Sequence, residues 1–120
     1  MRFGSSLGLR LNELAILLVA HDWQCKFMWA VHRGIAIGAG LDEALVDAIE
    51  KDAPPQGMKD DEAVVFRFCQ ELLHTRNVSD ETFAVAKQAF GERGVTDLMG
   101  TMAYYTLVAM ALNVDRYPVA

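Results

Sequence analysis

Four residues near the start of the chain have side chains and spacing suited to chemistry. Cys25, Met28 and His32 follow one another at intervals of three and four residues, which places a thiol, a thioether and an imidazole on one helix face. Glu13 is the one acid in the apolar stretch 11–20. An acid there needs a partner, and a Glu facing His32 would orient the ring and favour its protonated form. The pattern indicates acid–base or thiol chemistry at Glu13, Cys25 and His32.

The helix that carries these side chains has Asp22 as its expected N-cap. Cys25 then falls in the first turn, where backbone N–H groups and the helix dipole favour a thiolate. His21 precedes the cap, and either lines the mouth of the site or faces solvent. We assign His21, Met28 and Trp29 to a substrate pocket. We predict no metal site, because four convergent ligands are missing.

A purely structural interpretation of the same residues stays open. A Cys or a His on an apolar helix face most often packs in a core. Glu13 would then pair at the surface with Arg10, three residues earlier. Periodicity alone does not choose between this interpretation and the catalytic one.

The composition narrows the class of protein. The chain has 120 residues, of which 52% are hydrophobic, and its net charge is −5, so a packed core is expected and a basic nucleic-acid surface is not. Two cysteines are too few for a secreted disulfide scaffold. The start of the chain lacks the apolar region of a signal peptide, and the longest apolar runs are too short to cross a bilayer. We therefore expect a cytoplasmic protein with free thiols and no membrane contact.

Apolar residues recur with a helical period nearly everywhere, and no strand pattern competes. The stripes lie in residues 7–18, 25–36, 41–49, 65–72, 83–90 and 95–114. Asp60 or Asp61 is the expected cap of the fourth helix, Ser79 caps the fifth, and Gly91 ends the fifth. The sequence thus predicts an all-α bundle of about six helices, with residues 1–120 as a single domain.

The last of these segments, residues 95–114, is apolar almost all round. Such a helix must be buried, either inside the subunit or between subunits. Full burial within so small a chain is difficult. We therefore expect a homo-oligomer.

Two runs of the sequence resemble a known family. "LNELAILLVAHDWQCKFMWAVHRGIAIGAGL", residues 11–41, and "GERGVTDLMGTMAYYTLVAMALNV", residues 91–114, resemble the carboxymuconolactone decarboxylase family, whose relatives include the alkylhydroperoxidase D-like proteins. The peroxidase relatives have a Glu, a Cys twelve residues later, a second Cys three further and a His four beyond. Glu13, Cys25 and His32 match three of these places, and Met28 replaces the second thiol. Decarboxylase-like relatives often have a Glu at that place.

The resemblance implies an alkylhydroperoxidase D-like bundle that uses no metal or organic cofactor. We expect a homo-oligomer, either a trimer or a hexamer. Relatives usually have further helices before the stretch that matches residues 2–7, so we expect this chain to be short at its N-terminus.

Three functions follow from the resemblance and the residues together. The first is decarboxylation of a small organic acid or lactone, with His32 as the proton donor, Glu13 as its orienting partner and Cys25 in the pocket. The second is thiol-dependent hydroperoxide reduction at Cys25, resolved by an external thiol because Cys69 is expected in the core. The third is a family member that has kept the fold and lost catalysis.

Overall fold

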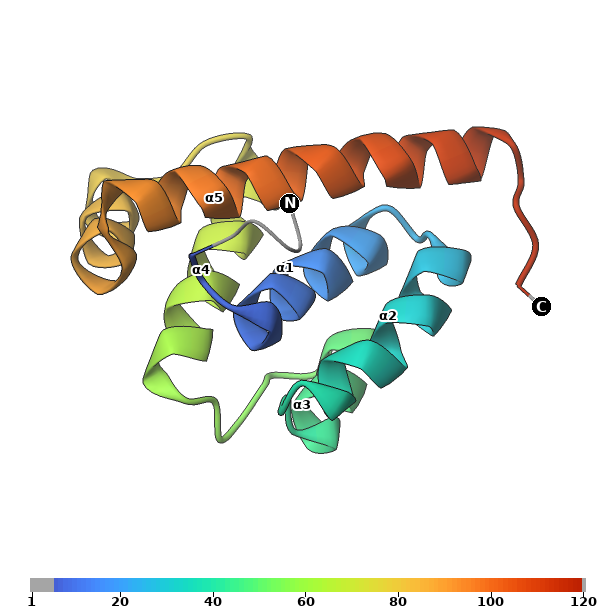
Figure 1. Cartoon of the computed structure of the whole chain (residues 1–120), viewed down its shortest axis with the longest axis horizontal. Helices are drawn as coiled ribbons and strands as arrows, with labels where there is room; N and C mark the ends of the chain where they lie inside the picture. Colours follow the sequence, from blue (N-terminus) through green and yellow to red (C-terminus); the bar gives the residue numbers. More distant parts are fainter. Residues whose placement is uncertain (1–5, 120) are drawn as a thin grey trace.

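One helix, α1 (Leu9–Asp22), lies at the centre of the fold, because all ten residues from 11 to 20 are buried. The computed structural model describes residues 6–119, and within that range it is all-helical. The other helices are α2 (Lys26–Gly38), α3 (Glu43–Glu50), α4 (Asp60–Thr75) and α5 (Asp80–Val114). In Figure 1, α5 runs along one side of α1, while α2 and α4 flank α1 on either side. The predicted all-α class is confirmed.

The helix starts follow local hydrogen bonding. The Ser79 side chain accepts the N–H of Thr82 at 3.1 Å, as predicted for an N-cap. The fourth helix differs from the prediction, because its N-cap is Lys59 and neither Asp60 nor Asp61. The carboxylate of Glu62 accepts the backbone N–H of Lys59 at 2.9 Å. The two aspartates instead lie in the first turn, where their negative charges interact favourably with the positive end of the helix dipole.

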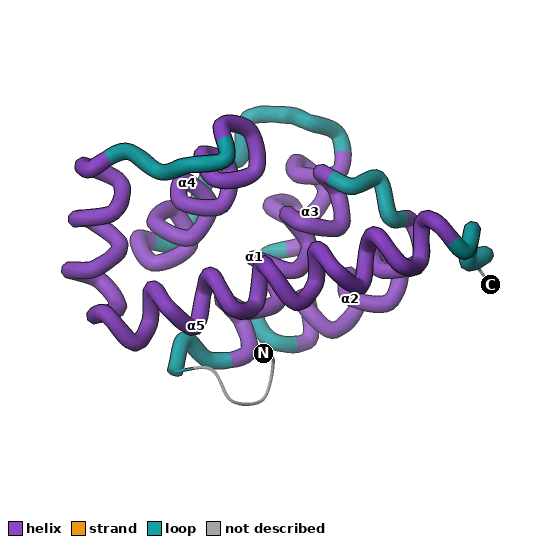
Figure 2. Tube along the Cα trace, turned by 90° about the horizontal axis from the view of Figure 1, so that it is seen from above, coloured by secondary structure: helices purple, strands orange, loops and turns teal. Residues whose placement is uncertain are grey.

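The described residues form five helices, whereas the sequence predicts about six. The last two expected segments are both present, but the chain continues as helix directly after Gly91. At Gly91 the backbone has φ 74° and ψ 174°, so α5 consists of two helical parts that meet at a kink. Figures 1 and 2 show the short first part turned away from the long second part.

Arg10 joins the start of α1 to the start of α4. Its guanidinium lies 2.5 Å from a carboxylate oxygen of Asp61 and 2.6 Å from one of Glu62. The hydrogen bonds that Arg10 donates to Asp61 raise the pKa of Arg10 and lower the pKa of Asp61. The alternative in which Arg10 pairs with Glu13 at the surface is wrong, because Arg10 is engaged here and Glu13 is fully buried.

The second part of α5 is buried on one side only. The helix buries Val95, Leu98, Met102 and Ala109 against the core, whereas its outer face exposes Met99, Tyr104, Leu107, Met110 and Val114. The helix buried all round is therefore α1, and full burial of residues 95–114 inside the subunit is wrong. By length and composition alone, α5 also reaches what a bilayer span needs, with a mean hydropathy of 1.2 over its best window.

Candidate active site

A buried acid and a buried imidazole meet between α1 and α2. Oε1 of Glu13 lies 2.7 Å from Nδ1 of His32, and the two residues are 0% and 7% exposed. Glu13 sits in the middle of α1, the most buried helix, and His32 lies on the inner face of α2. The contact predicted between the two side chains is present. Because Nδ1 of His32 is engaged with Glu13, Nε2 is the ring atom left for proton exchange.

The turn between α1 and α2 sets the position of Cys25. Cys25 N–H donates to the carbonyl of Ala20 at 2.9 Å, and Gln24 N–H donates to that of His21 at 3.1 Å. These two bonds and the positive φ of Gln24, 52°, define a Schellman motif. Asp22 is therefore the last residue of α1, and its predicted capping role is wrong. Cys25 is itself the N-cap of α2, and its side chain makes no capping hydrogen bond.

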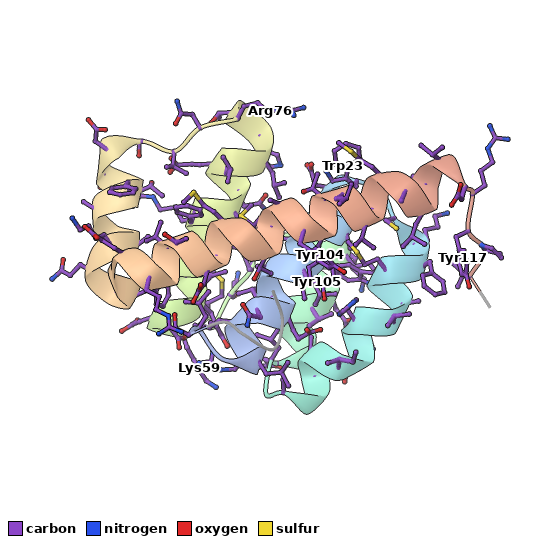
Figure 3. All side chains as sticks on the ribbon, turned by 45° about the horizontal axis from the view of Figure 1, so that its top comes forward. Trp23, Lys59, Arg76, Tyr104, Tyr105 and Tyr117 are labelled. Carbon is purple, nitrogen blue, oxygen red and sulfur yellow. The ribbon has the colours of Figure 1, made fainter. Side chains whose placement is uncertain are left out.

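A pocket of about 470 Å³ opens beside this turn. Its lining residues are Ala20, His21, Gln24, Cys25, Lys26, Trp29, Ala30, Glu50 and Val119. The segment after α5 reaches the pocket through Val119, and the ring of Tyr117 packs edge-on against Phe27 with 4.5 Å between centroids. Figure 3 shows Tyr117 beside α2. The pocket is thus bounded by the α1–α2 turn with the adjoining helix ends, by the last residue of α3 and by the segment after α5.

The residues singled out in the sequence fall into two groups. His21, Cys25 and Trp29 line the pocket, whereas Glu13, Met28 and His32 do not. Cys25 and His32 are seven residues apart, which is a rise of about 10.5 Å along a helix. Within residues 6–119, no hydrogen bond joins the Cys25 thiol to His32. The buried Glu13–His32 pair and Cys25 are therefore separate features of the contact between α1 and α2.

Tyr105 and Asp52 also contact these groups, and neither is among the site residues that the sequence predicts. The ring of Tyr105 meets that of His32 edge-on, with 5.4 Å between centroids, and the exposed ring of Tyr104 packs against that of Tyr105 with 5.1 Å between centroids (Figure 3). Asp52 lies 2.8 Å from Nε2 of His21. The helical period predicts that Tyr105 faces inward on α5, but it does not predict that His32 is the residue it contacts. Asp52 follows α3 in an irregular turn, so no spacing pattern predicts its contact.

The second cysteine is a core residue, as expected. Cys69 is fully buried, and its thiol lies 3.6 Å from the sulfur of Met102. Burial strongly raises the pKa of the Cys69 thiol, because the low-dielectric core disfavours the thiolate. Cys69 is therefore poorly suited to resolve an oxidised partner.

Among residues 6–119, no group of three or more His, Cys, Asp or Glu side chains could hold a metal ion. Comparisons of the chain with family models, with curated proteins and with solved structures find no match. The case for a function therefore depends on the geometry of the side chains and on the resemblance of the two sequence runs.

Proposed function

We propose that the chain is a carboxymuconolactone decarboxylase-like enzyme with an alkylhydroperoxidase D-like bundle. It performs cofactor-free acid–base chemistry on a small organic acid or lactone. The observation that carries this proposal is the Glu13–His32 pair, at 2.7 Å and almost fully buried. Burying a carboxylate and an imidazole together has a desolvation penalty that a purely structural scaffold does not need. The pair therefore favours an enzyme over a non-catalytic relative.

Decarboxylation needs a proton where carbon dioxide leaves. The C–C bond to the carboxylate breaks, its electron pair stays on the substrate as a delocalised carbanion or enolate, and that carbon takes a proton. His32 supplies the proton from Nε2, and the carboxylate of Glu13 stabilises the imidazolium beforehand through Nδ1. Apolar surroundings disfavour the ground-state carboxylate of the substrate and leave the more diffuse charge of the transition state less affected.

This proposal is tested by carbon dioxide release from a panel of small lactone acids and β-keto acids. We expect His32→Gln and Glu13→Gln to lower the rate by at least about 100-fold, the usual contribution of a positioned general acid. His74→Gln is the matched control, because His74 lies at the exposed end of α4 with an acid, Asp22, 3.7 Å away. A rate that survives both core substitutions would contradict the proposal.

Thiol-dependent hydroperoxide reduction is the second candidate, and the position of Cys25 favours it. Cys25 is a lining residue of the 470 Å³ pocket, although it is only 2% exposed, and Cys69 is buried elsewhere, so the resolving thiol would come from outside the chain. The test is consumption of an organic hydroperoxide with dithiothreitol as reductant. Cys25→Ser should abolish turnover and Cys69→Ser should keep it. Equal loss in both variants would contradict this candidate.

We also propose that the protein is a homo-oligomer, a trimer or a hexamer, in the cytoplasm. The exposed apolar side chains of α5 support this proposal. Leu107 is 62% exposed, and Met99, Met110 and Val114 share its surface. A continuous apolar face on a soluble protein usually marks an interface.

A further inference from the structure

A second histidine–carboxylate pair lies beside the pocket thiol. Nε2 of His21 is 2.8 Å from Oδ1 of Asp52, and the side chains are 22% and 82% exposed. The ring of His21 also packs against that of Trp29, with 5.9 Å between centroids. Asp52 therefore holds one ring nitrogen, and the indole limits rotation of the ring. Such a pair can hold a proton for a neighbouring group.

The Schellman motif brings His21 and Cys25 to the same wall of the pocket. His21 accepts through its carbonyl from the N–H of Gln24, and Cys25 is the next residue. Both His21 and Cys25 line the pocket, while His32 does not. The histidine available to the Cys25 thiol is thus His21, four residues earlier in the sequence, and not His32.

We propose that His21, oriented by Asp52, is the proton partner of Cys25, and that the pocket takes a small organic hydroperoxide. This inference rests on the thiol-dependent candidate function. The protein then has two histidine–carboxylate pairs with different roles. The His21–Asp52 pair exchanges a proton with the Cys25 thiol, and the Glu13–His32 pair is separate from it.

The reaction assigned to this pocket uses only the thiol, the imidazole and the hydroperoxide. His21 takes the proton of the Cys25 thiol, and the thiolate attacks the terminal oxygen of ROOH. An S–O bond forms, the O–O bond breaks, and the imidazolium of His21 gives its proton to the leaving RO⁻. The products are ROH and the sulfenic acid of Cys25. Two molecules of an external thiol then reduce the sulfenic acid, giving water and a disulfide.

One further pocket residue, Trp29, suits an oxygen-rich ligand. Nε1 of Trp29 is buried and has no hydrogen-bond partner among residues 6–119. A ligand oxygen would supply the acceptor that the fold itself lacks. Lys26 and Glu50 also line the pocket, with charges of opposite sign.

The test is the rate of Cys25 alkylation by iodoacetamide at pH 7 in the Cys69→Ser background. An ordinary cysteine, with a pKa of about 8.5, is only about 3% thiolate at that pH, so removal of an activating base lowers the rate by about tenfold or more. We expect this loss for His21→Asn and a smaller loss, about threefold, for Asp52→Asn. His74→Asn is the matched control and should leave the rate unchanged.

Glu13→Gln is the decisive comparison, because it alters the other pair. A Glu13→Gln rate reduced as much as that of His21→Asn, or a His21→Asn rate within twofold of the parent, would overturn the inference. Hydroperoxide turnover then separates the inference from the function on which it rests. Slow alkylation of His21→Asn without turnover in the parent would support the pair and refute the peroxidase. A hydroperoxide turnover rate that is the same in His21→Asn as in the parent would support the peroxidase function and refute the role of the His21–Asp52 pair.

Discussion

Nδ1 of His32 lies 2.7 Å from a carboxylate oxygen of Glu13, within the contact between α1 and α2. Glu13 is surrounded because α1 is covered on every side, and His32 reaches it from the inner face of α2. The bond fixes which ring nitrogen of His32 is committed to the protein. Glu13 and His32 are also much more deeply buried than the second histidine–carboxylate pair, His21 and Asp52.

The stability of the protein should depend on Glu13 in a graded way. Glu13→Ala leaves a cavity and a buried Nδ1–H without its acceptor, so we expect the free energy of unfolding to fall by about 3 kcal/mol. Glu13→Gln keeps the volume and a carbonyl acceptor, and we expect a loss of about 1 kcal/mol. Urea denaturation of both variants measures these values. Equal losses would contradict this graded dependence, because the volume and the acceptor kept in Glu13→Gln would then contribute nothing.

The junction of α4 and α5 should give the protein an acid-sensitive contact. Glu71 accepts the backbone N–H of Ser79 at 2.9 Å and also the hydroxyl of Thr82. These bonds, the one from Ser79 first, lower the pKa of Glu71 from 4.5 to about 2. Because the folded value lies below the unfolded one, the stabilisation is complete above about pH 4.5 and is lost as the pH falls towards 2.

Glu71→Gln isolates this effect from the other carboxylates. We expect the variant to melt below the parent at pH 7, and the difference in Tm to shrink steadily between pH 4.5 and pH 2. Thermal unfolding followed by circular dichroism across that range makes the comparison. A difference in Tm that is constant with pH would contradict the assignment.

The apolar face of α5 should hold subunits together. Leu107→Glu places a charge at the centre of that face, which a buried interface does not accommodate. We expect the mass measured by light scattering to fall from that of an oligomer to that of a single 13.3 kDa chain. Val31→Glu is the matched control, since Val31 is an exposed valine on α2, at 44%. An unchanged mass for Leu107→Glu would exclude this face as the interface.

The sequence was most informative where a single residue broke a pattern. Glu13 interrupts an apolar run, and this predicted a buried partner, which the structure shows to be His32. Ser79 and Gly91 likewise act where capping and backbone rules predict. The element type, the site pair and the core position of Cys69 therefore follow from local rules.

The position of Cys25, the contact of His21 with Asp52 and the identity of the central helix depend on tertiary structure. The turn before α2 uses Gln24 with positive φ, and glutamine does not signal that conformation, so Cys25 was placed one turn too deep in its helix. The contact between His21 and Asp52 joins the last turn of α1 to the turn after α3, 31 residues further along the chain. The all-round apolarity of residues 95–114 predicts burial either inside the subunit or between subunits, and the structure excludes the first, because α1, which carries Glu13 and Asn12, occupies the centre.

The state of the His32 ring tests the central claim most directly. Long-range ¹H–¹⁵N correlation spectra at neutral pH distinguish a ring protonated at Nδ1 from one protonated at Nε2. If Glu13 holds His32 as the structure indicates, Nδ1 carries the proton in the parent protein, and Glu13→Ala shifts the ring to the mixture of tautomers typical of an exposed histidine, such as His74. A ring protonated mainly at Nε2 alone in the parent, or one unchanged in Glu13→Ala, would contradict the account.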